Sequence, residues 1–466
     1  MSLYSITSMM KLAIASVWFA ASAVAKCLSG KAIVNLDITT GPAEQLGSGF
    51  LYGIPNNGTS ASNAIPDHFF TDIKFHGTRA GGSQLTDGGW SSGGKRAYDQ
   101  RFNSTLSTYR SARKHGGHFI LIANDLWGAD GGQDGALYPG DNGDWTETEA
   151  FLDQLIFDMR VNNLIEDVTI DIWNEPDYPM FWDRSWGQYL DYWNHAYNYL
   201  RKNIPEVKLG GPAAAYAPDL NREKWHSFLA NIAANDTIPD QYSWHHIGDD
   251  SNWPDRSASQ FRRLREQYSL PERPISVDEY AWPWRQDPAN TAWYLSQMER
   301  NDIVAMRANW GSKEDLHDRM ADLLGKTEDG NYYPNGEWWM YKYYAEMDGE
   351  RAETRVSEDV NFDVFATIGD GIVKVLAGTR TYELDPEVGD YVLEVNGLDS
   401  ALGLDPFGTI SVTTYRFDYV ERSARRDLPR TSELRTTIFL MARSAFFTIL
   451  RTTRRLMHSS LTSKAG

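Results

Sequence analysis

The chain has 466 residues, of which 41% are hydrophobic and 23% charged, and its formal net charge is −18. These values are typical of a soluble globular protein with one large domain and a smaller one. The negative charge argues against nucleic acid as a partner, because phosphates require a basic surface. Cys27 is the single cysteine, which excludes an internal disulfide.

The first 25 residues have the pattern of a secretory signal peptide. Lys11 supplies a positive charge, and the apolar run Leu12–Ala25 ends in a small-x-small tripeptide. The run is too short for a comfortable membrane span, so we expect a secreted protein with no integral membrane segment. Sequons at Asn57, Asn103 and Asn235 fit glycosylation during secretion.

Residues 46–350 alternate short β-like runs with stretches whose apolar residues recur at helical spacing, which indicates βα units around a parallel sheet. Eight units in this length predict a (β/α)8 barrel. A doubly wound sheet is the alternative, but no Gly-rich dinucleotide motif follows an early strand. The predicted strands are Gly49–Tyr52, Ile73–Thr78, His118–Ala123, Val168–Trp173, Lys208–Gly211, Tyr242–His246, Ile275–Glu279 and Ile303–Ala308.

The pattern changes near Asn361 to apolar and polar alternation with Gly or Asp at the turns. It predicts an antiparallel β-sandwich over residues 351–420, to which residues 26–45 add a strand at Ala32–Ile38. The tail 421–466 carries nine Arg and one Lys against three acids. Its run Ile438–Leu450 fits an amphipathic helix on a membrane surface, but a tail without a folded role is favoured.

Neither a metal nor an organic cofactor is predicted. The loop Gly128–Asp144 is acidic, but its spacing does not match an EF-hand, so a solvated loop is favoured over a calcium site. His245 and His246 with two following aspartates could bind a metal, although no matching ligands stand elsewhere.

Two glutamates end predicted barrel strands, where barrel active sites lie. Glu175 follows an apolar strand within Trp173-Asn174-Glu175-Pro176, and Glu279 ends the strand Ile275–Glu279. The 104 residues between them span three βα units, which places them on strands four and seven. Asp278 is a competing candidate, but the strand period of two lets only one of the adjacent acids point into the barrel.

Two facing carboxylates suit cleavage of a glycosidic bond in a carbohydrate substrate. A Glu175 carboxyl beside Trp173 is partly desolvated, which raises its pKa and suits a general acid. Asn174 can donate to a sugar hydroxyl. A spacing of about 5–5.5 Å between the carboxylates gives retention of configuration and about 6.5–9.5 Å gives inversion, which sequence alone does not decide.

The motif Trp173-Asn174-Glu175-Pro176, with Phe181-Trp182, Tyr189 and Leu209-Gly210-Gly211-Pro212-Ala213, resembles glycoside hydrolase family 39. Ser276-Val277-Asp278-Glu279-Tyr280 is similar to the nucleophile strand of that family. The resemblance implies a retaining (β/α)8 glycosidase, such as a β-xylosidase, with Glu175 as acid/base and Glu279 as nucleophile.

The resemblance also implies further sugar-site residues. Arg79 would support the nucleophile, His245 would match a strand-six histidine, and Trp310 would form a sugar platform, with Trp127 as a weaker platform. One position departs from the family pattern, because Ile247 stands where a tyrosine is usual. Tyr280 is the candidate to replace that tyrosine.

Two other functions remain open at this stage. The missing strand-six tyrosine fits a carbohydrate-binding barrel with impaired catalysis. The basic tail fits a membrane-associated protein that remodels cell walls.

Overall fold

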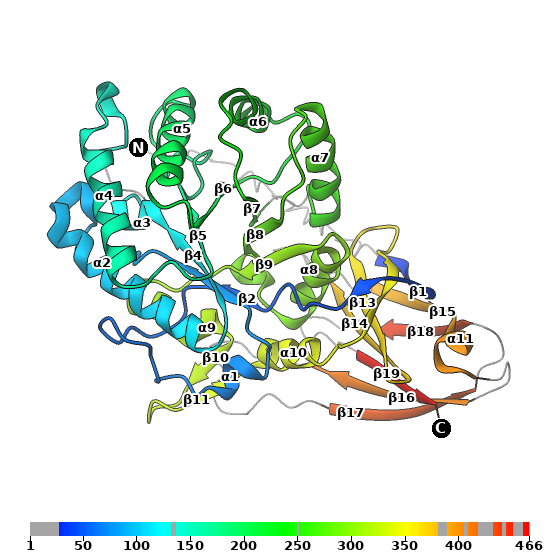
Figure 1. The fold of residues 1–466 in the computed structure, drawn as a ribbon. Helices are drawn as coiled ribbons and strands as arrows, with labels where there is room; N and C mark the ends of the chain where they lie inside the picture. Colours follow the sequence, from blue (N-terminus) through cyan, green and yellow to red (C-terminus); the bar gives the residue numbers. More distant parts are fainter. Residues whose placement is uncertain are drawn as a thin grey trace, which may run out of the picture.

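The computed structural model describes residues 28–131, 137–248, 251–380, 389–404, 409–417, 432–439, 444–450 and 460–465. The predicted signal peptide lies outside these residues. Figure 1 shows two parts, a helix-surrounded barrel and a β-sheet beside it that carries the C-terminus.

The predicted (β/α)8 barrel is confirmed. Eight parallel strands close on one another in chain order. They are β2 (Gly49–Leu51), β3 (Gly77–Ala80), β4 (His118–Ile122), β5 (Val168–Asp171), β6 (Lys208–Ala214), β7 (Gln241–His246), β8 (Ile275–Tyr280) and β9 (Ile303–Arg307). Strand β3 begins four residues later than predicted. The residues before it, up to Phe75, form a turn whose N–H groups bond to carbonyls at the end of the preceding helix.

Helices cover the outside of the barrel (Figure 1). The main ones are α2 (Trp90–Lys114), α4 (Thr146–Val161), α5 (Trp186–Asn203), α6 (Glu223–Asn235), α7 (Pro254–Gln267), α8 (Pro288–Arg300) and α10 (Gly336–Ala345). Shorter helices are α1 (His68–Thr71), α3 (Ala123–Trp127), α9 (Arg319–Asp322) and α11 (Leu398–Leu402), with 3-10 turns at Asp141–Gly143, Pro283–Arg285 and Lys313–His317.

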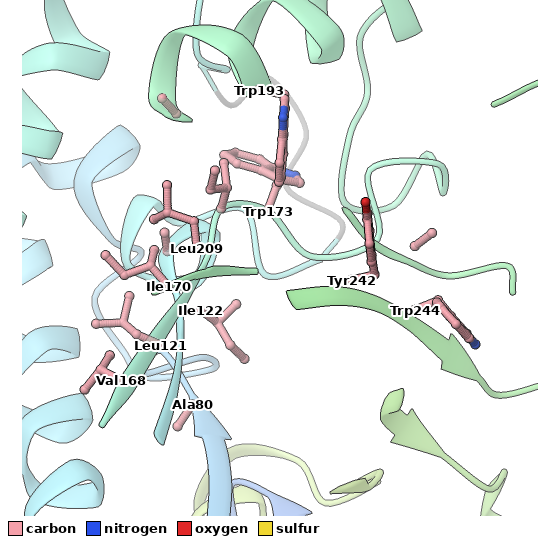
Figure 2. Packing of buried hydrophobic residues seen from close by; sticks show 14 of the residues in the cluster. Ala80, Leu121, Ile122, Val168, Ile170, Trp173, Trp193, Leu209, Tyr242 and Trp244 are labelled. Atoms are coloured by element: carbon pink, nitrogen blue, oxygen red, sulfur yellow. The ribbon is translucent and has the colours of Figure 1, made fainter. Parts of the chain in front are cut away.

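Apolar side chains of strands and helices meet in one large core. Helix α5 begins after Ser185, whose side chain accepts from the Gln188 N–H, and its Trp193 packs inward. Trp173, two residues beyond β5, packs against Tyr192 of the same helix with ring centroids 5.3 Å apart, and Figure 2 labels Trp173 and Trp193 among the buried side chains of this core. This packing fixes the chain just beyond β5, where Asn174 and Glu175 follow.

The second part is a nine-stranded, mainly antiparallel sheet in the order β17-β16-β19-β14-β13-β12-β1-β15-β18. Its strands are β1 (Leu28–Pro42), β12 (Glu350–Arg355), β13 (Phe362–Gly369), β14 (Ile372–Thr379), β15 (Gly389–Asn396), β16 (Thr409–Arg416), β17 (Ser432–Phe439), β18 (Ser444–Leu450) and β19 (Ser460–Ala465). The N-terminal strand β1 pairs with β12 and, in parallel, with β15. A small hairpin, β10 (Leu324–Lys326) and β11 (Tyr332–Pro334), stands apart from it.

The expectation that the tail has no folded role is wrong, and so is the alternative of an amphipathic helix over Ile438–Leu450. The described tail residues form β17, β18 and β19, and β19 lies between β14 and β16. The reason is local composition, since Ser432–Phe439 and Ser444–Leu450 are rich in Thr, Ile and Phe, which favour strands. Within the described residues, no helix is long and apolar enough to cross a membrane.

Candidate active site

Glu175 is held in a strained position beyond the end of β5. Its φ of 44° lies in the left-handed region, which is unfavourable for a residue with a Cβ. The Glu175 N–H donates to the Ala213 carbonyl at 2.9 Å, and the Glu175 carbonyl accepts from the Tyr178 N–H at 3.0 Å. Since Ala213 belongs to β6, two neighbouring strands fix the direction of the Glu175 side chain.

A register shift in β8 aligns Glu279 with the strand beside it. Trp244 pairs with Val277, yet the next residue, His245, pairs with Glu279, so Asp278 is an extra residue in β8. Such a bulge redirects the side chains that follow it. His245 and Glu279 therefore stand side by side. Asp278 is buried and accepts from the Ser276 hydroxyl, whereas Glu279 keeps a small exposed part.

Arg79 connects three side chains at the carboxyl ends of the strands. Its Nε donates to Oδ2 of Asp171 at 2.8 Å, its Nη1 to Oε1 of Glu279 at 2.8 Å and its Nη2 to Oδ1 of Asn174 at 2.7 Å. Burial alone would lower the pKa of Arg79, but the charges of Asp171 and Glu279 raise it above its ordinary value. The cation is permanent, and it fixes the position of the Glu279 carboxylate.

His245 contacts both candidate carboxyls. Its Nδ1 lies 2.8 Å from Oε1 of Glu175, and its Nε2 lies 3.9 Å from Oε1 of Glu279. One imidazole ring therefore contacts both carboxyls, which places the two side chains close together at the carboxyl ends of the strands. Both glutamates can therefore act on one bond.

The two glutamates have different electrostatic surroundings. Burial raises the pKa of Glu175 to about 7, and Arg79 opposes the shift only partly. Burial also raises the pKa of Glu279, but His245 and Arg79 both oppose it, and Arg79 donates directly to this carboxylate. Glu175 is thus suited to hold a proton near neutral pH, and Glu279 is suited to carry a negative charge.

The structure brings Arg79, Asn174, Glu175, His245 and Glu279 together but places two other predicted residues elsewhere. The Tyr280 hydroxyl is buried against the Tyr341 hydroxyl, because the residue after Glu279 points to the opposite side of β8. It does not replace the missing strand-six tyrosine. Trp127 is also buried, with its Nε1 donating to the Leu137 carbonyl, so it is a core residue and not a sugar platform.

Trp310 belongs to a stack of three indoles. Its ring stacks on Trp282 with centroids 4.8 Å apart, and Trp282 stacks on Trp284 at 4.9 Å. The Trp310 Nε1 donates to the Ala281 carbonyl at 2.9 Å, two residues after Glu279. The stack therefore lies at the catalytic face, and Trp310 remains a candidate platform.

Sequence reasoning missed Asp171 and Asn124. Asp171 is the last residue of β5, and burial raises its pKa to about 7 despite the charge of Arg79. The Asn124 side chain accepts from the Asn174 N–H at 3.0 Å and so fixes the backbone before Glu175. Their position at strand ends was a usable signal, since barrel sites draw residues from several strands.

The acidic loop shows ion pairs in its described part. Asp130 pairs with Arg101 at 3.1 Å and Asp141 with Arg184 at 2.7 Å. Over the described ranges, no group of three or more His, Cys, Asp or Glu residues is arranged to hold a metal ion. The two aspartates that follow His246 lie outside those ranges, while His246 itself contacts the Ser257 hydroxyl at 2.9 Å.

A family model described as glycosyl hydrolases family 39 matches residues 151–298, which include Glu175, His245 and Glu279. Over 190 residues the chain is 27% identical to a 3-O-alpha-D-galactosyl-alpha-L-arabinofuranosidase of Bifidobacterium longum subsp. longum. The aligned region covers 37% of this chain and 16% of that enzyme. The chain spans about a sixth of the length of the curated relatives it matches.

Solved structures share the fold of both parts. The structure of N2152 from Neocallimastix frontalis superposes on this chain with a TM-score of 0.72 and 17% sequence identity. The superposition covers 94% of this chain and 100% of the N2152 chain. A monomeric beta-xylosidase from Caulobacter crescentus CB15 has a TM-score of 0.54 and 16% identity, with 93% and 99% covered. The barrel with its accessory sheet is therefore an arrangement that these proteins have in common.

Proposed function

We propose that the chain is a member of glycoside hydrolase family 39, whose model matches residues 151–298, and that it cleaves O-glycosidic bonds with retention of configuration, using Glu175 and Glu279. The observation that carries the proposal is the position of His245 between the two carboxyls, at 2.8 Å from Glu175 and 3.9 Å from Glu279. Such a pair supplies an acid on one side of a sugar ring and a carboxylate on the other.

In the first step, the Glu279 carboxylate attacks the anomeric carbon while Glu175 gives its proton to the departing glycosidic oxygen. The anomeric C–O bond breaks as the bond to Glu279 forms, and the aglycone leaves as an alcohol. The raised pKa of Glu175, about 7, supports its role as the acid.

In the second step, Glu175 takes a proton from water, which displaces Glu279 from the anomeric carbon and restores both side chains. Two inversions at one carbon give net retention. The Asn174 amide is oriented for the sugar, because Arg79 binds its Oδ1 and leaves its Nδ2 donors for a hydroxyl group.

The proposed glycosyl group is a pentose, either xylose or arabinose. This rests on the names of similar proteins, which include an arabinofuranosidase and a beta-xylosidase. A panel of aryl glycosides and plant-wall oligosaccharides tests the assignment. Turnover confined to hexosides would contradict it.

The decisive experiment combines two variants with azide. Glu279→Ala loses nearly all turnover and, with azide, forms a glycosyl azide of inverted configuration. Glu175→Ala with azide forms the retained product, because Glu279 still attacks first. Asp278→Asn serves as the control for the neighbouring acid and gains nothing from azide. Full activity of Glu279→Ala would contradict the assignment.

A binding-only barrel is the second candidate, because Ile247 stands where the family has a tyrosine. Calorimetric binding of panel oligosaccharides without release of reducing sugar would support that candidate and contradict catalysis.

We also propose that the protein is secreted and glycosylated. The support is the N-terminal pattern together with the exposure of the sequon residues Asn57, Asn103 and Asn235. Expression in a eukaryotic secretory host, followed by N-terminal sequencing of the medium fraction and a mass shift on deglycosylation, tests both points. A protein that stays inside the cell with residues 1–25 still attached would contradict secretion.

A further inference from the structure

An exposed aromatic side chain, Tyr216, lies on the loop that follows β6, next to the acid/base. The loop is joined to the Glu175 segment by hydrogen bonds from two sides. Glu175 N–H donates to the Ala213 carbonyl at 2.9 Å, and the Ala215 N–H donates to Oδ1 of Asp177 at 2.7 Å. The backbone of Tyr216 is therefore tied to the segment that carries Glu175, through Asp177, which lies two residues after Glu175.

Both backbone polar groups of Tyr216 are hydrogen-bonded. Its N–H donates to Oδ2 of Asp177 at 3.2 Å, and its carbonyl accepts from Trp225 Nε1 at 2.8 Å. Tyr216 also forms an isolated antiparallel bridge with His246, the neighbour of His245. A buried carboxylate, Asp177, thus serves to hold this loop in place.

The Tyr216 side chain is 45% exposed although its backbone is so constrained. The Arg222 guanidinium lies over the ring, 5.1 Å from its centroid, which orients the ring by a cation–π contact. A large, exposed and oriented aromatic ring on a rigid loop costs little entropy when it binds a flat apolar surface. The C–H face of a sugar ring is such a surface.

We infer that Tyr216 is a binding platform for the leaving-group sugar. This sugar lies on the opposite side of the scissile bond from the sugar whose anomeric carbon Glu279 attacks. The inference rests on the proposed retaining mechanism, in which the nucleophile and the leaving group lie on opposite faces of the anomeric carbon. Tyr216 adjoins the acid/base side, whereas the tryptophan stack of Trp282, Trp284 and Trp310 adjoins the nucleophile side. The ligand class is therefore an oligosaccharide with at least one sugar beyond the bond that breaks.

Matched substrates separate this role from the chemistry itself. A glycosyl fluoride and an oligosaccharide share the same glycosyl group, but the fluoride has a single-atom leaving group that reaches no platform. We expect Tyr216→Ala to lower kcat/KM for xylotriose roughly tenfold or more and to leave kcat/KM for β-D-xylosyl fluoride within about twofold. If the parent prefers arabinosides, an arabinose oligosaccharide and an arabinosyl fluoride replace these two substrates.

Two further variants complete the test. Tyr216→Phe keeps the ring and retains most of the parent kcat/KM, because stacking does not need the hydroxyl. Phe157→Ala removes an even more exposed ring, on α4, and leaves kcat/KM for both substrates unchanged. Thermal unfolding of each variant shows that the fold is intact.

The possible failures are distinct. Suppose that the parent hydrolyses the fluoride, and that Tyr216→Ala lowers kcat/KM equally for both substrates or for neither. The platform role is then wrong, and the retaining mechanism is unaffected. If the parent hydrolyses no glycosyl fluoride, the proposed function fails and the platform fails with it.

Discussion

His245 and Glu279 stand opposite each other on the parallel strands β7 and β8, with the imidazole Nε2 3.9 Å from Oε1 of the carboxylate. Among the described residues, this Nε2 has no hydrogen-bond partner although it is buried. Burial lowers the pKa of His245, so a neutral ring is favoured near neutral pH. A neutral ring with its proton on Nε2 would present that N–H to Glu279 and accept the Glu175 proton at Nδ1.

The acid limb of the pH profile tests this contact. Protonated His245 is the largest influence that opposes the raised pKa of Glu279, and the neutral ring favours the same carboxylate through its Nε2–H. His245→Asn removes it, so the pKa of Glu279 rises further and the nucleophile is lost at a higher pH. The expected result is an acid limb of kcat/KM that moves to higher pH, measured with an activated aryl glycoside. A lower rate with an unmoved acid limb would show that His245 has only a packing role.

The alkaline limb reports on Glu175. Since burial raises its pKa to about 7, the protonated acid disappears above about pH 7 and kcat/KM falls there. Glu175→Gln removes the alkaline limb. It lowers the rate by about 10²–10⁴-fold for substrates with poor leaving groups and much less for 2,4-dinitrophenyl glycosides, which need no proton. Equal losses for both substrates would contradict the acid role.

Stability provides an independent measure of the same carboxyl. A pKa raised from its ordinary value of 4.5 to about 7 means that the folded state binds more protons than the unfolded state between these two pH values. Unfolding free energy therefore falls as pH rises from about 4 to about 7. We expect Glu175→Gln to be more stable than the parent at about pH 8, by on the order of 1–3 kcal/mol, with little difference at about pH 4. Urea unfolding at both pH values measures it, and a less stable variant at pH 8 would contradict the raised pKa.

Arg79 is predicted to be a structural requirement as well as a catalytic one. Arg79→Met leaves the Asp171 and Glu279 carboxylates without their buried cation, which costs on the order of 3–5 kcal/mol. Adding Asp171→Asn removes one of the stranded charges, so the double variant should lose less stability than the sum of the single losses. Chemical denaturation of the four proteins gives the coupling. Simple additivity would show that the two side chains do not act together.

The tail is predicted to stabilise the sheet rather than to anchor the protein. Truncation after Val420 removes β17, β18 and β19, and strand β16 pairs only with β17 and β19 within the described sheet. The truncated chain should unfold at a lower temperature and expose the β14 edge to aggregation. An unchanged melting temperature together with loss of vesicle binding would instead favour the membrane anchor.

The barrel could be predicted from the sequence, because eight apolar runs separated by helical stretches have few other ways to bury their side chains. The sequence also indicated Glu175 and Glu279 as candidates, because each lies at or just after the end of a buried strand, where loops converge. The local pattern was wrong about the tail, because it treated Ile438–Leu450 as one segment, whereas β17 ends at Phe439 and β18 begins at Ser444.

Which side chains act together depends on how the strands pair, and the sequence did not show that pairing. The extra residue Asp278 in β8 shifts the register by one, which aligns His245 with Glu279 and sends Tyr280 to Tyr341. A bulge depends on pairing with strands distant in sequence, so it leaves no mark in the local period of two. For the same reason, the sequence did not show that Arg79 of β3 binds Asp171 of β5, because the two strands are brought together only by the order of strands in the barrel.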